Sequence, residues 1–238
     1  MTAINIRPAT AQDLDDIARI HADALQPFAK FSKAMYGQDP RDALPAMTRY
    51  SFGNPQNIFS VAEDSASGQV VGFLRYKIVD PENPPPKSEL GPPPPGLKHK
   101  EHLEDIWKRF NDPREEDQDA VYEEVHQGRR HVYGVHLMIN PNHQRKGIGR
   151  KLLQTAIDVS EAEAFPAILV SSRESHPLYS SLGFEDQKVW TNDNEYWARE
   201  IEQREKDLGI TGCEGITEEC AGLTEEEALM IRWPATSL

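Results

Sequence analysis

The sequence predicts a mixed α/β fold, with antiparallel strands in its first part and strand–helix–strand crossovers in its second. Two apolar segments, 58–63 and 70–79, are joined by a turn-rich pentapeptide and predict an antiparallel hairpin. Apolar runs at 131–139 and 167–170 flank a stretch with helical spacing at 148–162, which predicts a crossover. The chain shows no internal repeat.

Length and composition favour one domain built around one core. The chain has 238 residues, of which 38% are hydrophobic, so it can bury one full core but not two large ones. We expect a single domain over residues 1–238 that carries an insertion at about 80–130 and a C-terminal extension at about 191–238.

Charge and cysteine content narrow the classes of function. A net charge of −13 argues against binding to nucleic acid or to an anionic membrane surface. Cys213 and Cys220 lack the spacing of metal ligands, so we expect free thiols and no metal site. No basic start precedes an apolar run at the N-terminus, and no segment reaches the roughly eighteen apolar residues of a membrane span. We therefore expect a cytoplasmic protein and leave a nuclear location open.

The N-terminal elements follow from local patterns. Residues 4–7 alternate as a short strand does, and Thr10 offers an N-cap to an amphipathic helix that runs to about Leu25. Prolines and a glycine break the stretch 26–56, which we expect to be irregular with one short helix near 41–50. Loops of this kind often shape pockets.

The composition changes in the middle of the chain. Eight prolines between Pro81 and Pro95 enforce extended chain that cannot join a central strand, so we expect an exposed insertion. A charged segment, 101–125, follows with a predicted break at Asp112–Pro113. Its apolar residues recur at helical spacing and are Leu103, Ile106, Trp107 and Phe110. Two interpretations stay open: helices that pack one apolar stripe on the core, and a lid or wall beside a substrate.

The second half alternates strands and helices. Ser175 is a predicted helix N-cap, and Gly183 is a predicted helix end. The expected elements are a strand at 131–139, a loop at 140–146, a helix at 148–162, a strand at 167–170, a helix from 175 to 182, a strand at 184–190, a helix at 194–207 and a strand at 228–233.

A basic segment that contains glycine opens the helix at 148–162. Four of the seven residues from Arg145 to Lys151 are Arg or Lys. Because a helix N-terminus carries partial positive charge, each cation there costs about 0.3–1 kcal/mol unless an anion is bound. Gly147 and Gly149 let backbone N–H groups converge on phosphate oxygens. The segment predicts a phosphate-binding loop, with a solvated basic turn as the alternative, and fits neither the Rossmann nor the P-loop motif.

This segment resembles a family signature. Residues 144–149 read Gln-Arg-Lys-Gly-Ile-Gly and match the Gln/Arg-x-x-Gly-x-Gly/Ala motif of the GNAT superfamily of acetyltransferases. Residues 178–184 read Leu-Tyr-Ser-Ser-Leu-Gly-Phe and are similar to the second family element, about thirty residues after the first. The resemblance is strong over roughly 130–190, and the front hairpin and N-terminal helix agree with it in type.

The resemblance implies a GNAT-like fold: a central, mostly antiparallel sheet that is splayed at a parallel strand pair and flanked by helices. It implies acetyl-CoA as the cofactor, with the backbone of 137–139 on the pantetheine arm and residues 144–150 on the pyrophosphate. Ser172 stands where the family often has Asn and is expected to make the same polar contact. The implied cofactor-binding residues are Leu137, Met138, Ile139, Gln144, Arg145, Lys146, Gly147, Ile148, Gly149, Arg150 and Ser172.

The resemblance makes Tyr179 the implied catalytic residue. A tyrosine with a pKa of about 10 is protonated at neutral pH, but a thiol with a pKa of about 8.5 is the stronger acid. We therefore expect Tyr179 chiefly to hydrogen-bond the leaving thiolate. Backbone N–H groups of Met138 or Ile139 could hold the oxyanion. The alternative is a tyrosine that packs a helix on the sheet with its hydroxyl exposed.

The general base stays open. The strand positions where family members often carry Glu or His hold Tyr133 and Val135, which are poor bases at pH 7. His136 is one residue off and is expected on the opposite face unless a β-bulge shifts the register. Residues near the start of the strand that could act through water are His131, Glu123 and Glu124. We expect either an acceptor amine of low pKa or a base that works through water.

Three hypotheses for the function remain. The first is an N-acetyltransferase that acts on a primary amine of a small molecule or amino acid derivative, as a monomer or homodimer. The second is a protein or peptide acetyltransferase for lysine or an N-terminus, with the acidic segment 101–125 attracting a basic peptide. The third is a catalytically silent acyl-CoA-binding sensor or interaction protein. Candidates for the wall of the acceptor site are Phe28, Phe31, Tyr36 and Trp107.

Overall fold

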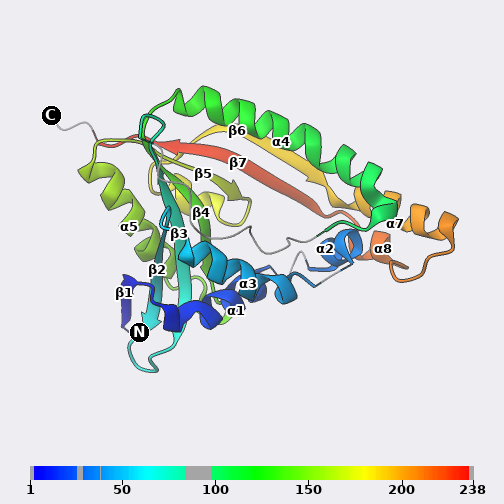
Figure 1. The fold of residues 1–238 in the computed structure, drawn as a ribbon, viewed down its shortest axis with the longest axis horizontal. Coiled ribbons are helices and arrows are strands. Elements are labelled where there is room, and N and C mark those ends of the chain that lie inside the picture. Colours follow the sequence, from blue (N-terminus) through cyan, green and yellow to red (C-terminus); the bar gives the residue numbers. More distant parts are fainter. Residues whose placement is uncertain (1–2, 26–28, 38, 84–97, 236–238) are drawn as a thin grey trace.

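The fold is known from a computed structural model that describes residues 3–25, 29–37, 39–83 and 98–235. Seven strands of this part of the chain form one sheet in the order β1-β2-β3-β4-β5-β7-β6 (Figure 1). Neighbouring strands pair antiparallel except β4 and β5, which are parallel. The strands are β1 (Ile4–Pro8), β2 (Asn57–Asp64), β3 (Val70–Val79), β4 (His131–Ile139), β5 (Ala167–Ser172), β6 (Glu185–Asp193) and β7 (Thr224–Arg232). The expected mixed α/β fold with a mostly antiparallel sheet is confirmed.

Helices cover both faces of the sheet. Helices α5 and α6 pack on one face. Helix α1 packs on the other face against β2 and β3, and α4 runs along that same face over β5, β6 and β7 (Figure 1). The α-helices are α1 (Leu14–Ala24), α2 (Ala29–Tyr36), α3 (Pro40–Gly53), α4 (Glu104–His126), α5 (Ile148–Ala162), α6 (His176–Ser180), α7 (Asn194–Leu208) and α8 (Ile216–Glu219), and the 3-10 helices are η1 (Ala11–Asp13), η3 (Glu101–Leu103) and η4 (Pro141–His143).

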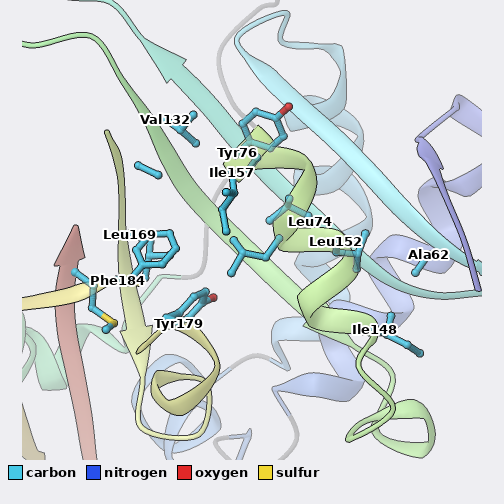
Figure 2. Close-up of a cluster of buried hydrophobic side chains, with 14 of the residues drawn as sticks. Ala62, Leu74, Tyr76, Val132, Ile148, Leu152, Ile157, Leu169, Tyr179 and Phe184 are labelled. Atoms are coloured by element: carbon cyan, nitrogen blue, oxygen red, sulfur yellow. The ribbon is translucent and has the colours of Figure 1, made fainter. Parts of the chain in front are cut away.

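The largest apolar cluster lies between α5 and the sheet. The inward residues of α5 recur every three to four positions, so Leu152, Ala156 and Ile157 all face the strands and are buried. Figure 2 shows Leu152 and Ile157 pointing at the sheet near Leu74. Complete burial of one such leucine stabilises the fold by about 1.5–3 kcal/mol. This cluster fixes the start of α5 against the ends of β3 and β4.

The expected helix after Thr10 begins with a 3-10 turn. Asp13 closes the turn, because its carboxylate accepts hydrogen bonds from the Thr10 backbone N–H and hydroxyl. Arg7 donates two further hydrogen bonds to Asp13, and this contact holds the pKa of that carboxyl at about 2. Helix α1 then runs from Leu14 and buries Ile17 against β2 and β3.

The expectation of irregular chain over 26–56 is partly wrong. Besides α3, which covers the predicted short helix, the structure contains α2. Phe31, Ala34 and Met35 are spaced as one face of a helix and are buried against α7 and α8, so packing determines this helix. Phe28 lies outside the described residues.

The predicted break at Asp112–Pro113 is also wrong. Helix α4 runs through Pro113 without interruption, although proline lacks the N–H of the regular helical hydrogen bond. Ile106 before the proline and Val125 after it are held in two separate apolar clusters, and these contacts outweigh the local cost. The prolines from Pro84 to Pro95 of the expected insertion lie outside the described residues.

The last strand begins four residues earlier than expected. Strand β7 starts at Thr224, which pairs with Asp193 of β6, and thus includes three consecutive glutamates. Glutamate is a poor strand former, so the sequence alone places the strand start at the apolar run from Ala228. The short helix α8 is not predicted by the sequence.

Candidate active site

The parallel strands β4 and β5 separate part of the way along their length. Their register covers three residue pairs and ends at Gly134 and Leu169, while β4 continues to Ile139 and β5 to Ser172. Between the diverging strands lies a cavity of about 440 Å³, called the central cavity below. Beyond Gly134, β4 therefore stays paired with β3 on one side, while its backbone groups on the β5 side border a space.

A bulge in β4 sits at the point of separation. Arg75 of β3 faces His136 and Tyr76 faces Gly134, so Val135 is an extra residue in β4. A single extra residue reverses the alternation of side chains. His136 consequently shares a face with Tyr133 instead of lying opposite to it.

The central cavity joins the strand gap to a wall made of aromatic and acidic side chains. Phe31, Tyr36 and Trp107 line it, as expected from the sequence. The charged residues in the lining are Arg114, Arg173, Glu174, Glu225, Glu226 and Glu227. Four carboxylates against two guanidinium groups leave the wall negative, which favours a cationic ligand.

A second cavity of about 370 Å³, the side cavity, adjoins this wall. It shares Phe110, Arg114, Glu225 and Glu227 with the central cavity and adds Trp190 and Trp197, among others. The side cavity therefore extends this end of the central cavity, which is apolar on its sides and acidic along β7.

Tyr179 of α6 lines the central cavity and is 7% exposed. Its ring lies 5.7 Å from that of Phe184 in an edge-to-face arrangement. Burial raises the pKa of Tyr179 to about 12, and a hydrogen bond with the Ser175 hydroxyl acts in the opposite direction. Figure 2 shows Tyr179 at the α6 end of the apolar cluster. The phenol is protonated at neutral pH and can donate a hydrogen bond into the cavity.

Ser172 and Ser175 form a small polar group beside Tyr179. Ser172 ends β5 and lines the central cavity with an exposed side chain. The Ser175 hydroxyl donates to the Ser172 carbonyl at 3.1 Å, and the two hydroxyls are 3.2 Å apart. Ser175 stands at the N-cap position of α6, but its side chain makes no capping hydrogen bond, so the predicted capping role is wrong.

The loop before α5 turns through left-handed backbone. Arg145 has a φ of 61° and Gly147 a φ of 76°, a backbone conformation that residues other than glycine rarely adopt. Around these residues the side chains fold back on the loop: the Gln144 amide donates to the Ile139 carbonyl at 3.3 Å, and the Lys146 ammonium donates to the Asn142 carbonyl at 2.9 Å. The loop is thus shaped by its own hydrogen bonds.

The N-terminus of α5 fits an anion. No acidic residue stands in its first turn, and a Cβ added to Gly147 would meet nothing within 4 Å. Gly149 is different, because a Cβ there would lie 3.2 Å from Leu178 Cδ2. Arg150 is exposed and donates to the Ser181 hydroxyl at 2.7 Å, which ties α5 to α6. An open helix N-terminus with cations around it suits a pyrophosphate.

These features separate the expected cofactor residues into two places. Leu137, Met138 and Ser172 line the central cavity together with Tyr179. Residues 144–150 lie beyond the end of β4 and outside the cavity lining. The two places are joined by the last residues of β4, as an elongated cofactor with a thioester at one end and a pyrophosphate further along requires.

His136 is the histidine of β4 that reaches the central cavity. Its ring lies 4.5 Å from that of His21 on α1. Burial lowers the pKa of His136 to about 3, and the nearby His21 and Arg75 act in the same direction. Burial and Arg75 likewise lower the pKa of His21 to about 4. Both imidazoles are therefore neutral at pH 7.

The other base candidates from the sequence lie away from the cavity lining. His131 is buried, with Nε2 2.6 Å from the Tyr122 hydroxyl and Nδ1 2.7 Å from the Arg129 carbonyl. Glu123 and Glu124 are exposed on α4. Tyr133 packs its ring 5.2 Å from that of Tyr122, also outside the lining. Val135 does line the cavity but carries no proton acceptor.

Sequence reasoning missed the carboxylates of β7. Burial raises the pKa of Glu225 above its ordinary value. Glu227 accepts hydrogen bonds from Arg114 at 3.2 Å and from Gln118 at 2.9 Å. The signal was a run of three glutamates directly before the last apolar run, which is unusual for a buried strand.

The described part of the chain lacks two further features, a group of potential metal ligands and a membrane-spanning helix. No three of its His, Cys, Asp or Glu side chains are grouped so that they could hold a metal ion. None of its helices is long and apolar enough to cross a membrane.

Comparisons with known proteins agree with this geometry. The solved structures with a similar fold include a histone acetyltransferase HPA2 and related acetyltransferase from Corynebacterium glutamicum, with 17% identity over 99% of this chain and 98% of that chain and a TM-score of 0.56. They also include a mosquito arylalkylamine N-acetyltransferase like 5b, with 16% identity over 97% of this chain and 100% of that chain and a TM-score of 0.55. No curated protein matches the sequence. The model of the acetyltransferase (GNAT) family matches residues 25–184, more than half of the chain, and the chain therefore belongs to the GNAT family of acetyl-CoA-dependent acetyltransferases.

Proposed function

We propose that this acetyltransferase acts on a primary amine of a small molecule or an amino acid derivative. The observation that carries the proposal is the central cavity, which connects the gap between β4 and β5 with an aromatic and acidic wall. A cavity of about 440 Å³ is in the range of small-molecule sites. Aromatic rings and carboxylates together favour an ammonium group on an apolar skeleton.

We assign the cofactor side to the residues that the family signature indicates. The backbone of Leu137–Ile139 takes the pantetheine arm, residues 144–150 hold the pyrophosphate, and Ser172 adds a polar contact. The open N-terminus of α5 and the end of pairing between β4 and β5 support this assignment. When bound, acetyl-CoA supplies the acetyl group as a thioester.

Tyr179 is the proposed hydrogen-bond donor to the leaving sulfur. It is buried, it lines the central cavity, and its raised pKa keeps the phenol protonated. A hydrogen bond from the phenol stabilises a developing thiolate more strongly in a dry site than in water. His136 is neutral at pH 7 and can accept a hydrogen bond from an amine or a water.

We further propose that residues 1–238 work as one domain. The segment at about 80–130 contributes α4, and the C-terminal segment at about 191–238 contributes α7, α8 and β7. Both segments supply lining residues of the two cavities, for example Trp107 from α4 and Glu225 from β7. Neither segment is then an appendage to the site.

A peptide or protein acceptor is the second candidate. One observation favours it: α4 carries exposed carboxylates, including Glu115, Glu116 and Asp119, along its outer side. A basic peptide would be attracted to such a helix.

The test is an acetyl transfer assay that detects the product by mass spectrometry. Acetyl-CoA is offered with a panel of arylalkyl and alkyl primary amines, amino acids and a lysine-rich peptide. The proposal predicts acetylation of a small amine with a kcat/KM at least about tenfold above that of the peptide. Preferential acetylation of the peptide would contradict it, and CoA binding without turnover on any acceptor would favour a silent sensor.

A further inference from the structure

The acceptor end of the central cavity carries three consecutive glutamates of β7 in different environments. Side chains alternate along a strand, and Leu229 of the same alternation packs under α4, so Glu225 and Glu227 belong to the face that α4 covers. Glu226 shares the opposite face with Ala228. Glu225 and Glu227 line both the central and the side cavity.

Two of the three carboxylates already have cationic partners. Arg114 donates to Glu227 at 3.2 Å, and Arg173 lies 3.7 Å from Glu226. Glu225 takes part in none of the ion pairs within the described residues. Among these three carboxylates, Glu225 is therefore the one whose charge no Arg or Lys of the described residues pairs with.

The groups that face Glu225 come from three elements and from the turn after β5. Burial is the largest effect and raises the pKa of the Glu225 carboxyl, while a hydrogen bond with Asn194 of α7 lowers that pKa. The neighbouring charges of Glu227 on β7 and Glu174 after β5 raise it, and Arg114 of α4 lowers it. The net effect is a pKa above the ordinary value, which makes Glu225 a better proton acceptor than a solvated carboxylate.

Aromatic rings close the cavity around this carboxylate. Tyr36 of α2 and Trp107 of α4 lie with ring centroids 5.4 Å apart, and both line the central cavity. Phe110 belongs to the lining of both cavities. A cation between these rings and a carboxylate is stabilised from both sides.

We propose that Glu225 binds the ammonium group of the acceptor and takes its first proton, so that the preferred acceptor is a primary amine on an aromatic or other apolar skeleton. This inference rests on the proposed function and names the acceptor chemistry of the same cavity. It removes the need for an acceptor of low pKa, because a basic amine can enter as the cation and be deprotonated in place.

Acetyl transfer removes two protons from the acceptor nitrogen and replaces the thioester bond by an amide bond. The acceptor nitrogen enters with three protons and gives the first to the Glu225 carboxylate, which later releases it to water. The nitrogen lone pair forms the bond to the acetyl carbon while the carbon–sulfur bond of the thioester breaks. The nitrogen loses a second proton, which passes to the leaving sulfur while the Tyr179 hydroxyl hydrogen-bonds that sulfur, so the products are an amide and a free thiol.

Binding without acetyl-CoA is the first test. Calorimetry compares 2-phenylethylamine with its neutral counterpart 2-phenylethanol on the wild type, on Glu225→Gln and on Glu185→Gln, an exposed glutamate of β6 outside both cavities. We expect the wild type and Glu185→Gln to bind the amine at least about tenfold more tightly than the alcohol, and Glu225→Gln to lose that preference. An unchanged preference in Glu225→Gln would overturn the proposal.

Turnover against pH is the second test. Removal of a general base costs about 10²-fold or more in rate, so kcat of Glu225→Gln falls by that factor. Its kcat/KM then rises about tenfold per pH unit with the fraction of free amine, and Glu225→Asp restores part of kcat at neutral pH. A Glu225→Gln variant whose kcat/KM depends on pH as in the wild type would contradict the assignment. So would a His136→Asn variant that, unlike Glu225→Gln, abolishes the fall of the wild-type kcat/KM at low pH.

The two tests distinguish a failure of the proposed function from a failure of the role of Glu225. If the wild type acetylates no amine in the panel, the proposed function fails whatever the binding result is. If the wild type acetylates amines and Glu225→Gln matches it in amine preference and pH profile, only the role of Glu225 fails.

Discussion

Tyr179 is buried among apolar side chains and yet belongs to the lining of the central cavity. Tyr179→Phe keeps the ring that packs on Phe184 and removes the hydroxyl, so the fold and cofactor binding should persist. We predict a fall in kcat of about 10²-fold with an unchanged KM for acetyl-CoA, measured by steady-state kinetics.

The matched control is Tyr76→Phe. Tyr76 is buried in the same apolar cluster but lies outside the cavity lining. Its loss of a hydroxyl should leave kcat within about a factor of two. Equal losses in the two variants would assign the effect to packing rather than to the leaving group.

Gly147 gives a test of the anion site that separates charge from backbone strain. Asp and Asn have the same shape and tolerate left-handed backbone similarly, and a side chain at this position has open space. Gly147→Asp places a carboxylate at the N-terminus of α5 and should lower the affinity for CoA by at least about 100-fold in calorimetry, whereas Gly147→Asn should lower it far less. Equal affinities for the two variants would place the pyrophosphate elsewhere.

The roles of single residues could be predicted where a short local motif determines their position. The basic loop at 144–150 and Tyr179 could be located because each lies in a short motif beside a strand or helix end. The face of His136 could not be determined, because it depends on the extra residue Val135 in the pairing of β4 with β3. Glu225 could not be recognised, because its importance depends on which distant groups surround it.

Among the elements, α7 is linked to the segment before α4 by a buried carboxylate. The Glu205 side chain is 2% exposed and accepts hydrogen bonds from the Lys100 ammonium at 2.6 Å and from His102 at 3.0 Å. Burial acts to raise its pKa, but the hydrogen bonds and the charge of Lys100 outweigh burial and hold it below the ordinary value. This contact anchors the start of α4, which carries Trp107 of the acceptor wall.

Glu205→Gln should therefore destabilise the fold by about 2 kcal/mol at pH 7, as measured by denaturant unfolding. Because folding lowers the pKa of Glu205, its carboxylate stabilises the fold above the unfolded-state pKa. This stabilisation is lost as the pH falls through the folded-state pKa. The difference between wild type and variant should shrink over that acid range. Glu200→Gln, on the same helix in an exposed pair with Arg109, should cost less than about 0.5 kcal/mol, and a similar loss in both variants would contradict the account.

Element boundaries were predictable where the apolar pattern was regular. Strand β3 and helix α5 run as expected, because β3 is a short run rich in apolar residues between turn signals and the buried residues of α5 recur at helical spacing. Helix α2 and the unbroken α4 were not predictable, since contacts with α7, α8 and the sheet outweigh the prolines and polar residues within these segments.

In the molecule as a whole, the position of the site follows from the order of the strands in the sheet. The single parallel pair at β4 and β5 diverges after Gly134, and the central cavity forms at that divergence. The fold class and this parallel pair could be predicted from the sequence and the family resemblance. The wall of aromatic and acidic side chains in the central cavity could not be predicted, because α2, α4 and β7 contribute to it from positions far apart in the chain.

We expect one continuous site to hold acetyl-CoA with its sulfur next to Tyr179 and a cationic amine next to Glu225. A crystal structure with CoA and 2-phenylethylamine tests this arrangement. We predict the pyrophosphate at residues 145–150, the pantetheine arm between β4 and β5, and the ammonium within hydrogen-bonding distance of Glu225. An amine bound away from β7, or a CoA sulfur that does not enter the central cavity, would contradict it.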